Sequence, residues 1–196
     1  FYKDKEIKNE HIVRLYQLRE DVNKADLMDG EYPSKDDEIA IDRLYAENNG
    51  ISIGDKMKIE GNNYKVTGVI ALSDYSALFK NNTDMMFDAN KFTIALVTEN
   101  AFDKFGDAGL RKCYAWVNDD TTLSDKKQKE KADDIKDIIK KQAVMTDFVA
   151  RQDNQAIKFT GDDMGGDLVM VEWLLYIVIV ILAFIFAITA RSTIEQ

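Results

Sequence analysis

Residues 173–190 read WLLYIVIVILAFIFAITA, a run of 18 residues without a charged side chain. At a rise of about 1.5 Å per residue, a helix of this length spans roughly 27 Å, close to the hydrocarbon thickness of a bilayer. Its Leu, Ile, Val and Phe side chains together favour membrane insertion by roughly 4 to 7 kcal/mol. Apolar side chains surround such a helix, and a small polar domain has too little interior to cover them. The stretch therefore predicts a transmembrane helix rather than a buried core helix.

Both ends of this stretch carry side chains that suit the surface of a membrane. Trp173 and Tyr176 lie at its start and Arg191 follows its end, so we expect these three residues to anchor the helix at the two interfaces. The positive-inside rule leans towards a cytoplasmic C-terminus, because Arg191 adjoins the helix whereas the nearest preceding basic residue, Lys158, is distant. The predicted order is an extracytoplasmic domain over residues 1–167, a helix in the cell membrane over residues 168–190 and the start of a cytoplasmic segment over residues 191–196.

Nearly all of the charge lies before the apolar stretch. The chain has 26 Lys and Arg residues against 35 Asp and Glu residues, a net charge of -9. Phosphate binding needs clustered positive charge, so this balance disfavours nucleic acid as a partner. The one cysteine, Cys113, excludes an intrachain disulfide and is too few for a cysteine-based zinc site. Since the sequence starts at Phe1 and ends soon after Arg191, we expect a fragment of a longer protein.

Alternating apolar and polar residues predict several strands in the polar part. The clearest is a β-hairpin, in which residues 56–60 and 64–70 alternate on either side of a turn at Gly61, Asn62 and Asn63. The other predicted strands lie within residues 10–20, 38–41, 92–98 and 114–118.

Helical patterns are fewer and do not alternate regularly with the strands. We expect a short helix over residues 42–49 that ends at Gly50, and a helical turn over residues 101–105. A longer amphipathic helix is predicted from Thr122 or Ser124 to about Gln142, with a core stripe of Leu123, Ala132, Ile135, Ile138 and Ile139. Residues 144–151 are predicted to be extended and residues 161–167 a flexible acidic link. This order indicates an α+β domain, mainly antiparallel sheet with one long amphipathic helix, followed by the transmembrane helix.

Residues 30–70, GEYPSKDDEIAIDRLYAENNGISIGDKMKIEGNNYKVTGVI, resemble the extracytoplasmic region of FtsX-like ABC transporter permeases, related to the MacB periplasmic core domain. The shared pattern is an acidic residue opening a short strand, a small helix with an alanine, a Gly-Asp pair and a strand that closes on Val-x-Gly-Val. The residues in these places are Glu38, Ile39, Ala46, Gly54, Asp55, Val66, Gly68 and Val69. The predicted membrane helix, followed by Arg191, Ser192, Thr193, Ile194 and Glu195, looks like the second membrane helix of such a permease running into its cytoplasmic coupling segment.

The resemblance implies a function for the whole protein. The polar part would lie between the first and second membrane helices of a permease that works as a dimer of two copies with a separate cytoplasmic ATPase. Members of this group use ATP-driven movement to expel or release peptides, lipoproteins or antibiotics, or to activate cell-wall hydrolases. They typically insert a β-rich lobe, here about residues 30–100, into an α+β lobe; one domain or two lobes both remain open. The chain has no Gly-x-x-x-x-Gly-Lys phosphate loop, so ATP would be bound elsewhere.

One segment after the hairpin is rich in large apolar side chains among polar ones. These side chains are Tyr75, Leu78, Phe79, Met85, Met86 and Phe87. Aromatic and methionine side chains on a loop offer a large and adaptable contact area, which predicts a partner surface. The alternative, that they close the core under a long loop, is the commoner case.

Candidate catalytic and metal-binding residues are few. His11 is the one histidine, and there is no Gly-x-Ser-x-Gly or His-Glu-x-x-His motif. Cys113 follows a lysine, which favours a thiolate, although an inert thiol is commoner. Asp162, Asp163 and Asp167 lack the spacing of an EF-hand loop. We therefore expect no enzyme, no bound metal and no cofactor.

A second class of function fits the same organisation. An acidic α+β domain before a membrane helix also describes the extracytoplasmic sensing domain of a membrane receptor. A second apolar span after Gln196 would favour transport, whereas a helical linker with heptads would favour signalling. A membrane-anchored hydrolase is a third and weaker alternative.

Overall fold

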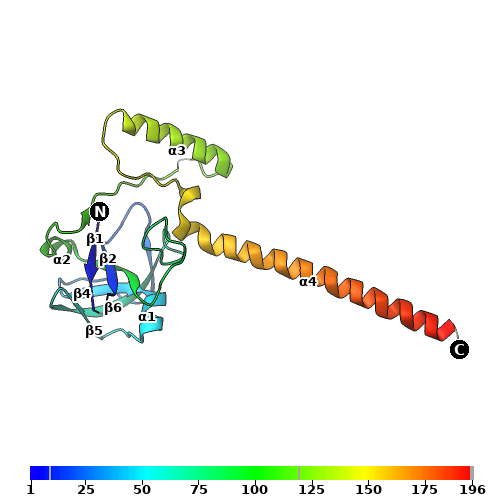
Figure 1. Ribbon diagram of the computed structural model, residues 1–196. Coiled ribbons are helices and arrows are strands. Elements are labelled where there is room, and N and C mark those ends of the chain that lie inside the picture. The colour runs from blue at the N-terminus through cyan, green and yellow to red at the C-terminus, as the bar shows by residue number, and fades with distance from the viewer. Residues whose placement is uncertain (9, 119, 195–196) are drawn as a thin grey trace. The chain divides into compact units, whose positions relative to one another are not determined.

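The computed structural model describes residues 1–8, 10–118 and 120–194, and within the last helix the side chains of residues 162–164 and 192–194 are outside the description. The chain divides into two compact units, Phe1–Lys158 and Phe159–Gln196, and each is described by itself. A sheet with short helices and one longer helix makes up the first unit, and a long helix makes up the described part of the second (Figure 1).

The first unit is built on a mixed sheet. Within the described residues its eight strands follow the order β3-β6-β4-β7-β2-β1-β8, with β5 paired to β6. The strands are β1 (Tyr2–Glu6), β2 (Ile12–Gln17), β3 (Ala25–Gly30), β4 (Glu38–Asp42), β5 (Lys56–Ile59), β6 (Asn62–Leu72), β7 (Phe92–Val97) and β8 (Leu110–Arg111). The β2–β7 and β4–β6 pairs are parallel, and the other five described pairs are antiparallel. The predicted α+β fold with a mainly antiparallel sheet is confirmed.

The helices follow the predicted order. They are α1 (Arg43–Asn49), α2 (Glu99–Lys104), α3 (Asp125–Lys140), the 3-10 helix η1 (Arg151–Asp153) and α4 (Gln155–Ile194). Helix α1 shows why the local prediction succeeded. The Asp42 carboxylate accepts hydrogen bonds from the backbone N–H groups of Leu44 (2.8 Å) and Tyr45 (3.2 Å). Gly50 ends the helix in the left-handed conformation, at φ 62°.

The predicted hairpin forms, but its turn lies earlier than expected. Ile59 pairs with Asn62, so Asn62 and Asn63 belong to β6 and the turn consists of Glu60 and Gly61. Both turn residues have positive φ angles, 47° and 87°. A two-residue turn in which both residues have positive φ matches the right-handed twist of the two strands that it joins. The prediction of Gly61, Asn62 and Asn63 as the turn was therefore wrong, because Glu60 accepts a conformation that usually favours glycine or asparagine.

Strands β2, β4 and β7 confirm three predicted strands, whereas residues 114–118 were predicted as a strand and form none. Those residues have suitable side chains but no strand partner, and Tyr114 is 82% exposed. Strand β1 was not predicted, because its buried positions are lysines. The ammonium groups of Lys3 and Lys5 donate to the carbonyl oxygens of Phe102 (2.7 Å) and Phe105 (3.0 Å) at the end of α2, which makes their burial tolerable.

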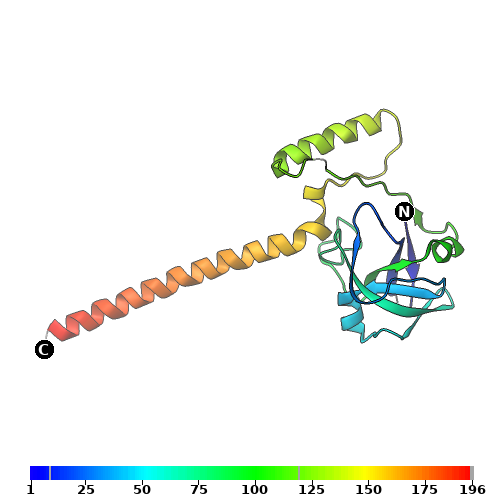
Figure 2. The ribbon, with the colours of Figure 1, turned by 180° about the vertical axis from the view of Figure 1, so that it is seen from behind.

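Helix α3 starts directly after Ser124 and is amphipathic, as predicted. Of the expected core stripe, Ala132 is buried, Leu123, Ile135 and Ile139 are half-buried, and Ile138 is 57% exposed. Figures 1 and 2 show the reason: α3 lies outside the sheet, and extended segments connect it to β8 on one side and to η1 on the other. Its apolar face therefore meets those segments and η1 instead of the main core.

The main core lies along the centre of the sheet. Strands β4 and β7 are buried along their whole length, and the side chains of Ile39, Ile41, Ile94 and Leu96 have no exposed surface. Because both faces of these strands are buried, their sequences are short continuous apolar runs.

Helix α4 begins at Gln155 and runs for 40 residues. Residues 161–167, predicted as a flexible acidic link, are helical. Glycine and aspartate are poor helix formers, but extending an existing helix adds one hydrogen bond for each residue fixed, and helical residues flank this segment on both sides. The prediction of a link considered composition alone and missed this cooperativity.

Candidate functional site

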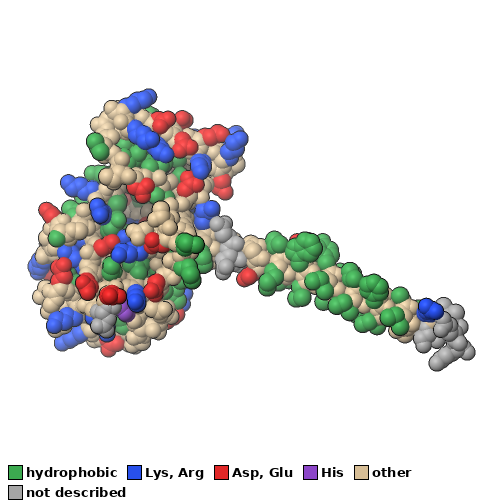
Figure 3. Space-filling model, viewed as in Figure 1, with side chains coloured by type: hydrophobic (Ala, Val, Ile, Leu, Met, Phe, Trp, Pro, Cys, Tyr) green, Lys and Arg blue, Asp and Glu red, His purple; other side chains and the backbone are tan. Residues whose placement is uncertain are grey.

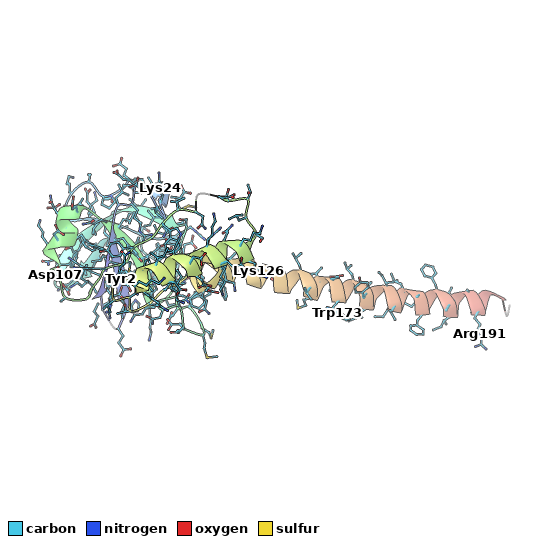
Figure 4. All side chains as sticks on the ribbon, turned by 90° about the horizontal axis from the view of Figure 1, so that it is seen from above. Tyr2, Lys24, Asp107, Lys126, Trp173 and Arg191 are labelled. Atoms are coloured by element: carbon cyan, nitrogen blue, oxygen red, sulfur yellow. The ribbon has the colours of Figure 1, made fainter. Side chains whose placement is uncertain are left out.

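The described part of α4 contains a candidate membrane span. Among the described residues, one helical segment, Gln155–Arg191, is long and apolar enough to cross a membrane by length and composition, and none of its most apolar window is buried. Hydrophobic side chains cover the visible face of this helix in Figure 3. Figure 4 labels Trp173 and Arg191 at the two ends of the apolar stretch. An apolar helix without a protein cover is suited to lipid.

The residues predicted to anchor the start of this span interact with each other. The rings of Trp173 and Tyr176 lie 6.4 Å apart in an edge-to-face arrangement. The Tyr176 hydroxyl donates to the carboxylate of Glu172 at 3.1 Å, one helical turn earlier. This places a carboxylate, a phenol and an indole ring on neighbouring positions, a combination that suits the headgroup layer. Arg191 lies in the last described turn of the helix.

The six residues predicted as a partner surface divide into two groups. Leu78 and Phe79 are 2% exposed and Tyr75 and Phe87 are half-buried, so these four side chains pack in the body of the first unit. The rings of Phe79 and Phe87 meet edge to face at 5.7 Å. Met85 and Met86, by contrast, are 95% and 81% exposed.

Tyr75 connects its loop to the sheet through a polar network. Its hydroxyl accepts a hydrogen bond from Arg14 Nη1 (2.9 Å) and shares another with the Tyr16 hydroxyl (3.0 Å). Arg14 in turn donates twice to the Asp4 carboxylate, at 2.8 and 2.9 Å. Its guanidinium lies 4.2 Å from the centre of the Tyr2 ring. Burial raises the pKa of Tyr16 well above its usual value, so this hydroxyl stays neutral.

Ser76 and Ala77, which follow Tyr75, contact the first turn of α4. The Ser76 hydroxyl donates to the carbonyl oxygens of Ala156 (2.6 Å) and Ile157 (3.1 Å). The backbone N–H of Ala77 donates to the same Ala156 oxygen at 3.1 Å. The loop after β6 and the start of the C-terminal helix are therefore hydrogen-bonded, although some 80 residues separate them in the sequence.

Asn82 makes a second set of contacts to the same region. Its side-chain amide donates from Nδ2 to the carbonyl oxygen of Asp153 (3.0 Å) and accepts at Oδ1 from the backbone N–H of Gln155 (2.7 Å). One amide thus bridges the residues on either side of Asn154. We call this set of contacts, made by Ser76, Ala77 and Asn82 with residues 153–157, the junction.

Asn154 fixes the point where α4 begins. Its side-chain oxygen accepts from the backbone N–H of Ala156 (3.0 Å), and its carbonyl oxygen accepts from Ile157 (3.1 Å) and Lys158 (3.0 Å). Asparagine is a preferred residue at this position because it satisfies N–H groups that a helix start leaves free. The start of the helix is therefore defined both by its own cap and by the junction.

The described residues hold no group of three or more His, Cys, Asp or Glu side chains that would bind a metal ion. The Nδ1 atom of His11 is hydrogen-bonded to the Tyr45 hydroxyl at 3.0 Å, and Cys113 is exposed. Asp167 is exposed, whereas the side chains of Asp162 and Asp163 lie outside the described residues.

Sequence reasoning missed Ser76 and Asn82. Asn154 before a helix is a readable capping signal, but a loop serine and a loop asparagine carry no periodic pattern that points to a distant partner.

Comparison with known proteins adds no further assignment. The chain matches no protein-family model, and no curated protein is significantly similar to it.

Proposed function

We propose that residues 1–167 are the extracytoplasmic domain of an FtsX-like ABC transporter permease subunit and that the apolar part of α4 is one of its membrane helices. In this proposal a partner ATPase in the cytoplasm drives movement of the membrane helices. The domain converts that movement into export or release of a peptide, lipoprotein or antibiotic, or into activation of a cell-wall hydrolase. The permease works as a dimer of two such subunits in the bilayer.

The observation that carries this proposal is the junction. A domain that exchanges movement with a membrane helix needs a firm attachment to it, and five hydrogen bonds join the Ser76–Asn82 loop to residues 153–157. Tyr75 extends the connection to Arg14 and Asp4 in the sheet. A displacement of the first turn of α4 would therefore reach β1 and β2 through hydrogen-bonded groups. The resemblance of residues 30–70 to FtsX-like permeases supports the same assignment.

The full reading frame provides the first test. The proposal predicts further apolar spans after Gln196 and a neighbouring gene for an ATPase. The second candidate, a sensing domain of a receptor, is favoured by the unbroken helix through residues 161–167, because signalling proteins use continuous helices across the membrane surface. A frame that continues into a heptad linker without another apolar span would replace the transporter by a receptor.

Biochemical coupling provides the second test. The full permease is reconstituted in nanodiscs with its ATPase, and ATP hydrolysis is compared between the original protein and the Ser76→Ala plus Asn82→Ala double variant. We expect the double variant to assemble with the ATPase but to lose the dependence of hydrolysis on the external domain. Ser73→Ala is the matched control, because Ser73 is exposed. Equal coupling in both variants would contradict the proposed role of the junction.

A further inference from the structure

Residues 112–118 and 120–150 belong to an appendage to the sheet, which we call the arm. It consists of an extended segment, helix α3 and a second extended segment. The rings of Trp116 and Phe148, one from each extended segment, stack at 5.7 Å, and the Lys136 ammonium group lies 5.3 Å from the centre of the Phe148 ring. Ala132 and Ala150, which also belong to the arm, are buried. The arm therefore has a small packed interior of its own.

Gln128 holds the arm together and also links it to η1. This glutamine of α3 is 8% exposed, and its side chain has three partners, two in the first extended segment and one in η1. Its Nε2 donates to the carbonyl oxygen of Leu123 (2.8 Å), and its Oε1 accepts from Asn118 (3.4 Å) and from Gln152 of η1 (3.0 Å). A buried amide is tolerated when its donors and acceptor are paired, so this group favours one position of the arm.

A second link lies beside it. The Lys129 ammonium group donates to the Asp153 carboxylate at 2.8 Å, and both side chains are 48% exposed. Exposed ion pairs contribute little to stability and are screened by salt. The arm continues directly into η1, where the Asp153 N–H donates to the Ala150 carbonyl oxygen (2.9 Å), and α3 itself is attached to η1 by one amide contact and one weak ion pair.

Asp153 is the residue where the arm and the junction meet. Its carboxylate binds Lys129 of the arm, while its carbonyl oxygen accepts from Asn82 of the junction. Asn154, the next residue, caps α4. The first turn of α4 is therefore held from two sides, and the two sides differ. The junction uses five hydrogen bonds to residues 153–157, whereas the arm uses two side-chain contacts to η1.

We propose that the arm is a breakable restraint on the first turn of α4, acting through Lys129–Asp153 and Gln128–Gln152. While both contacts are made, the cap at Asn154 is held in place. When α3 separates from η1, the junction still holds the start of α4, but the first turn of α4 opens more often. The consequence for transport rests on the proposed function: separation of α3 from η1 would regulate how firmly the first turn of α4 is held.

The test is amide hydrogen exchange of the full chain in detergent micelles, in which no ATPase is present. The probes are the N–H groups of Ala156, Ile157 and Lys158, which bond to Asn154. Lys129→Asp and Asp153→Lys each remove the ion pair, and each should speed exchange at these probes about twofold to fivefold. The combined Lys129→Asp and Asp153→Lys variant rebuilds the pair with reversed charges and should restore slow exchange.

Two further variants distinguish loss of these contacts from a general loss of structure. Lys127→Asp makes the same charge change on the exposed side of α3 and should leave exchange at the three probes unchanged. Gln152→Ala removes the amide link from the η1 side, so it should also speed exchange. Unchanged exchange in the three variants that break a contact, or failure of the reversed pair to restore it, would overturn the proposal. Because the experiment needs no partner, its result is independent of whether the protein is a transporter.

Discussion

The hydroxyl oxygen of Ser76 lies 2.6 Å from the carbonyl oxygen of Ala156, so a loop that follows β6 is hydrogen-bonded to the first turn of α4. The next residue, Ala77, donates its backbone N–H to the same oxygen at 3.1 Å. Two donors from the loop thus converge on one carbonyl oxygen in the first turn of α4. The first turn of α4, within the first unit, is therefore held by residues of the loop that follows β6.

Removing the Ser76 hydroxyl should weaken this attachment. Ser76→Ala removes the one hydroxyl hydrogen that the carbonyl oxygens of Ala156 and Ile157 share, and we expect a loss of about 0.5 to 1.5 kcal/mol in the free energy of unfolding. Pulse proteolysis of the chain in urea and detergent measures this change. Ser73→Ala should unfold at the same urea concentration as the original chain; an equal shift in both variants would show that the junction contributes nothing specific.

Removing the Tyr75 hydroxyl should be more costly. Arg14 and Tyr16, which are 6% and 7% exposed, both use this hydroxyl, and Tyr75→Phe leaves them with an unpaired polar atom. We expect a loss of about 1 to 3 kcal/mol, measured in the same way. Tyr114→Phe is the matched control, because Tyr114 is 82% exposed. A Tyr75→Phe variant as stable as its control would mean that the network does not support the loop.

The charge of Glu38 should make the free energy of unfolding depend on pH. Hydrogen bonds from the backbone N–H groups of Ser34 and Lys35 hold the pKa of Glu38 at about 2, below its usual 4.5. Because the pKa of Glu38 is lower in the folded state, its ionised carboxylate stabilises that state. This stabilisation is fully present above about pH 4.5 and is lost as the pH falls through about 2. Unfolding midpoints of the original chain and of Glu38→Gln should therefore differ above this window and converge within it. A difference that is constant across the window would contradict the assignment.

A charge in the middle of the apolar helix should prevent membrane insertion. Ile181→Asp replaces a side chain that favours the bilayer with one that disfavours it, a change of roughly 3 to 4 kcal/mol. The fraction of protein that remains in membranes after alkaline extraction should fall sharply. Ile138→Asp, on the exposed side of α3, should leave that fraction unchanged. Extraction of both variants to the same extent would argue against a membrane role for residues 173–190.

The elements that sequence predicted correctly depend on local chemistry. Helix α1 has its cap at Asp42 and its stop at Gly50, both within two residues of the helix, and strands β4 and β7 are short apolar runs. The errors arose where distant residues decide the outcome. Lysines line the buried face of β1 because the end of α2 supplies acceptors, and residues 114–118 lack a strand to pair with.

The candidate site was predictable only in its membrane part. A long apolar run identifies a candidate span, because the thickness of a bilayer sets the length that a spanning helix needs. The loop residues Tyr75 and Phe79 were recognised as a cluster, but whether such side chains face the core or a partner depends on packing that periodicity does not encode. Ser76 and Asn82 gave no signal, because their partners lie more than 70 residues away.

The account depends on a membrane that separates the sheet domain from residues 191–196, and labelling of a single thiol tests this directly. Cys113 is the one cysteine in the sequence and is exposed in the first unit. In cells whose outer barriers have been removed, a membrane-impermeant maleimide should label Cys113 without disruption of the cell membrane. In a Cys113→Ser background, Ser192→Cys should be labelled only after the membrane is opened. Labelling of both positions from outside, or of Cys113 only after disruption, would contradict the account.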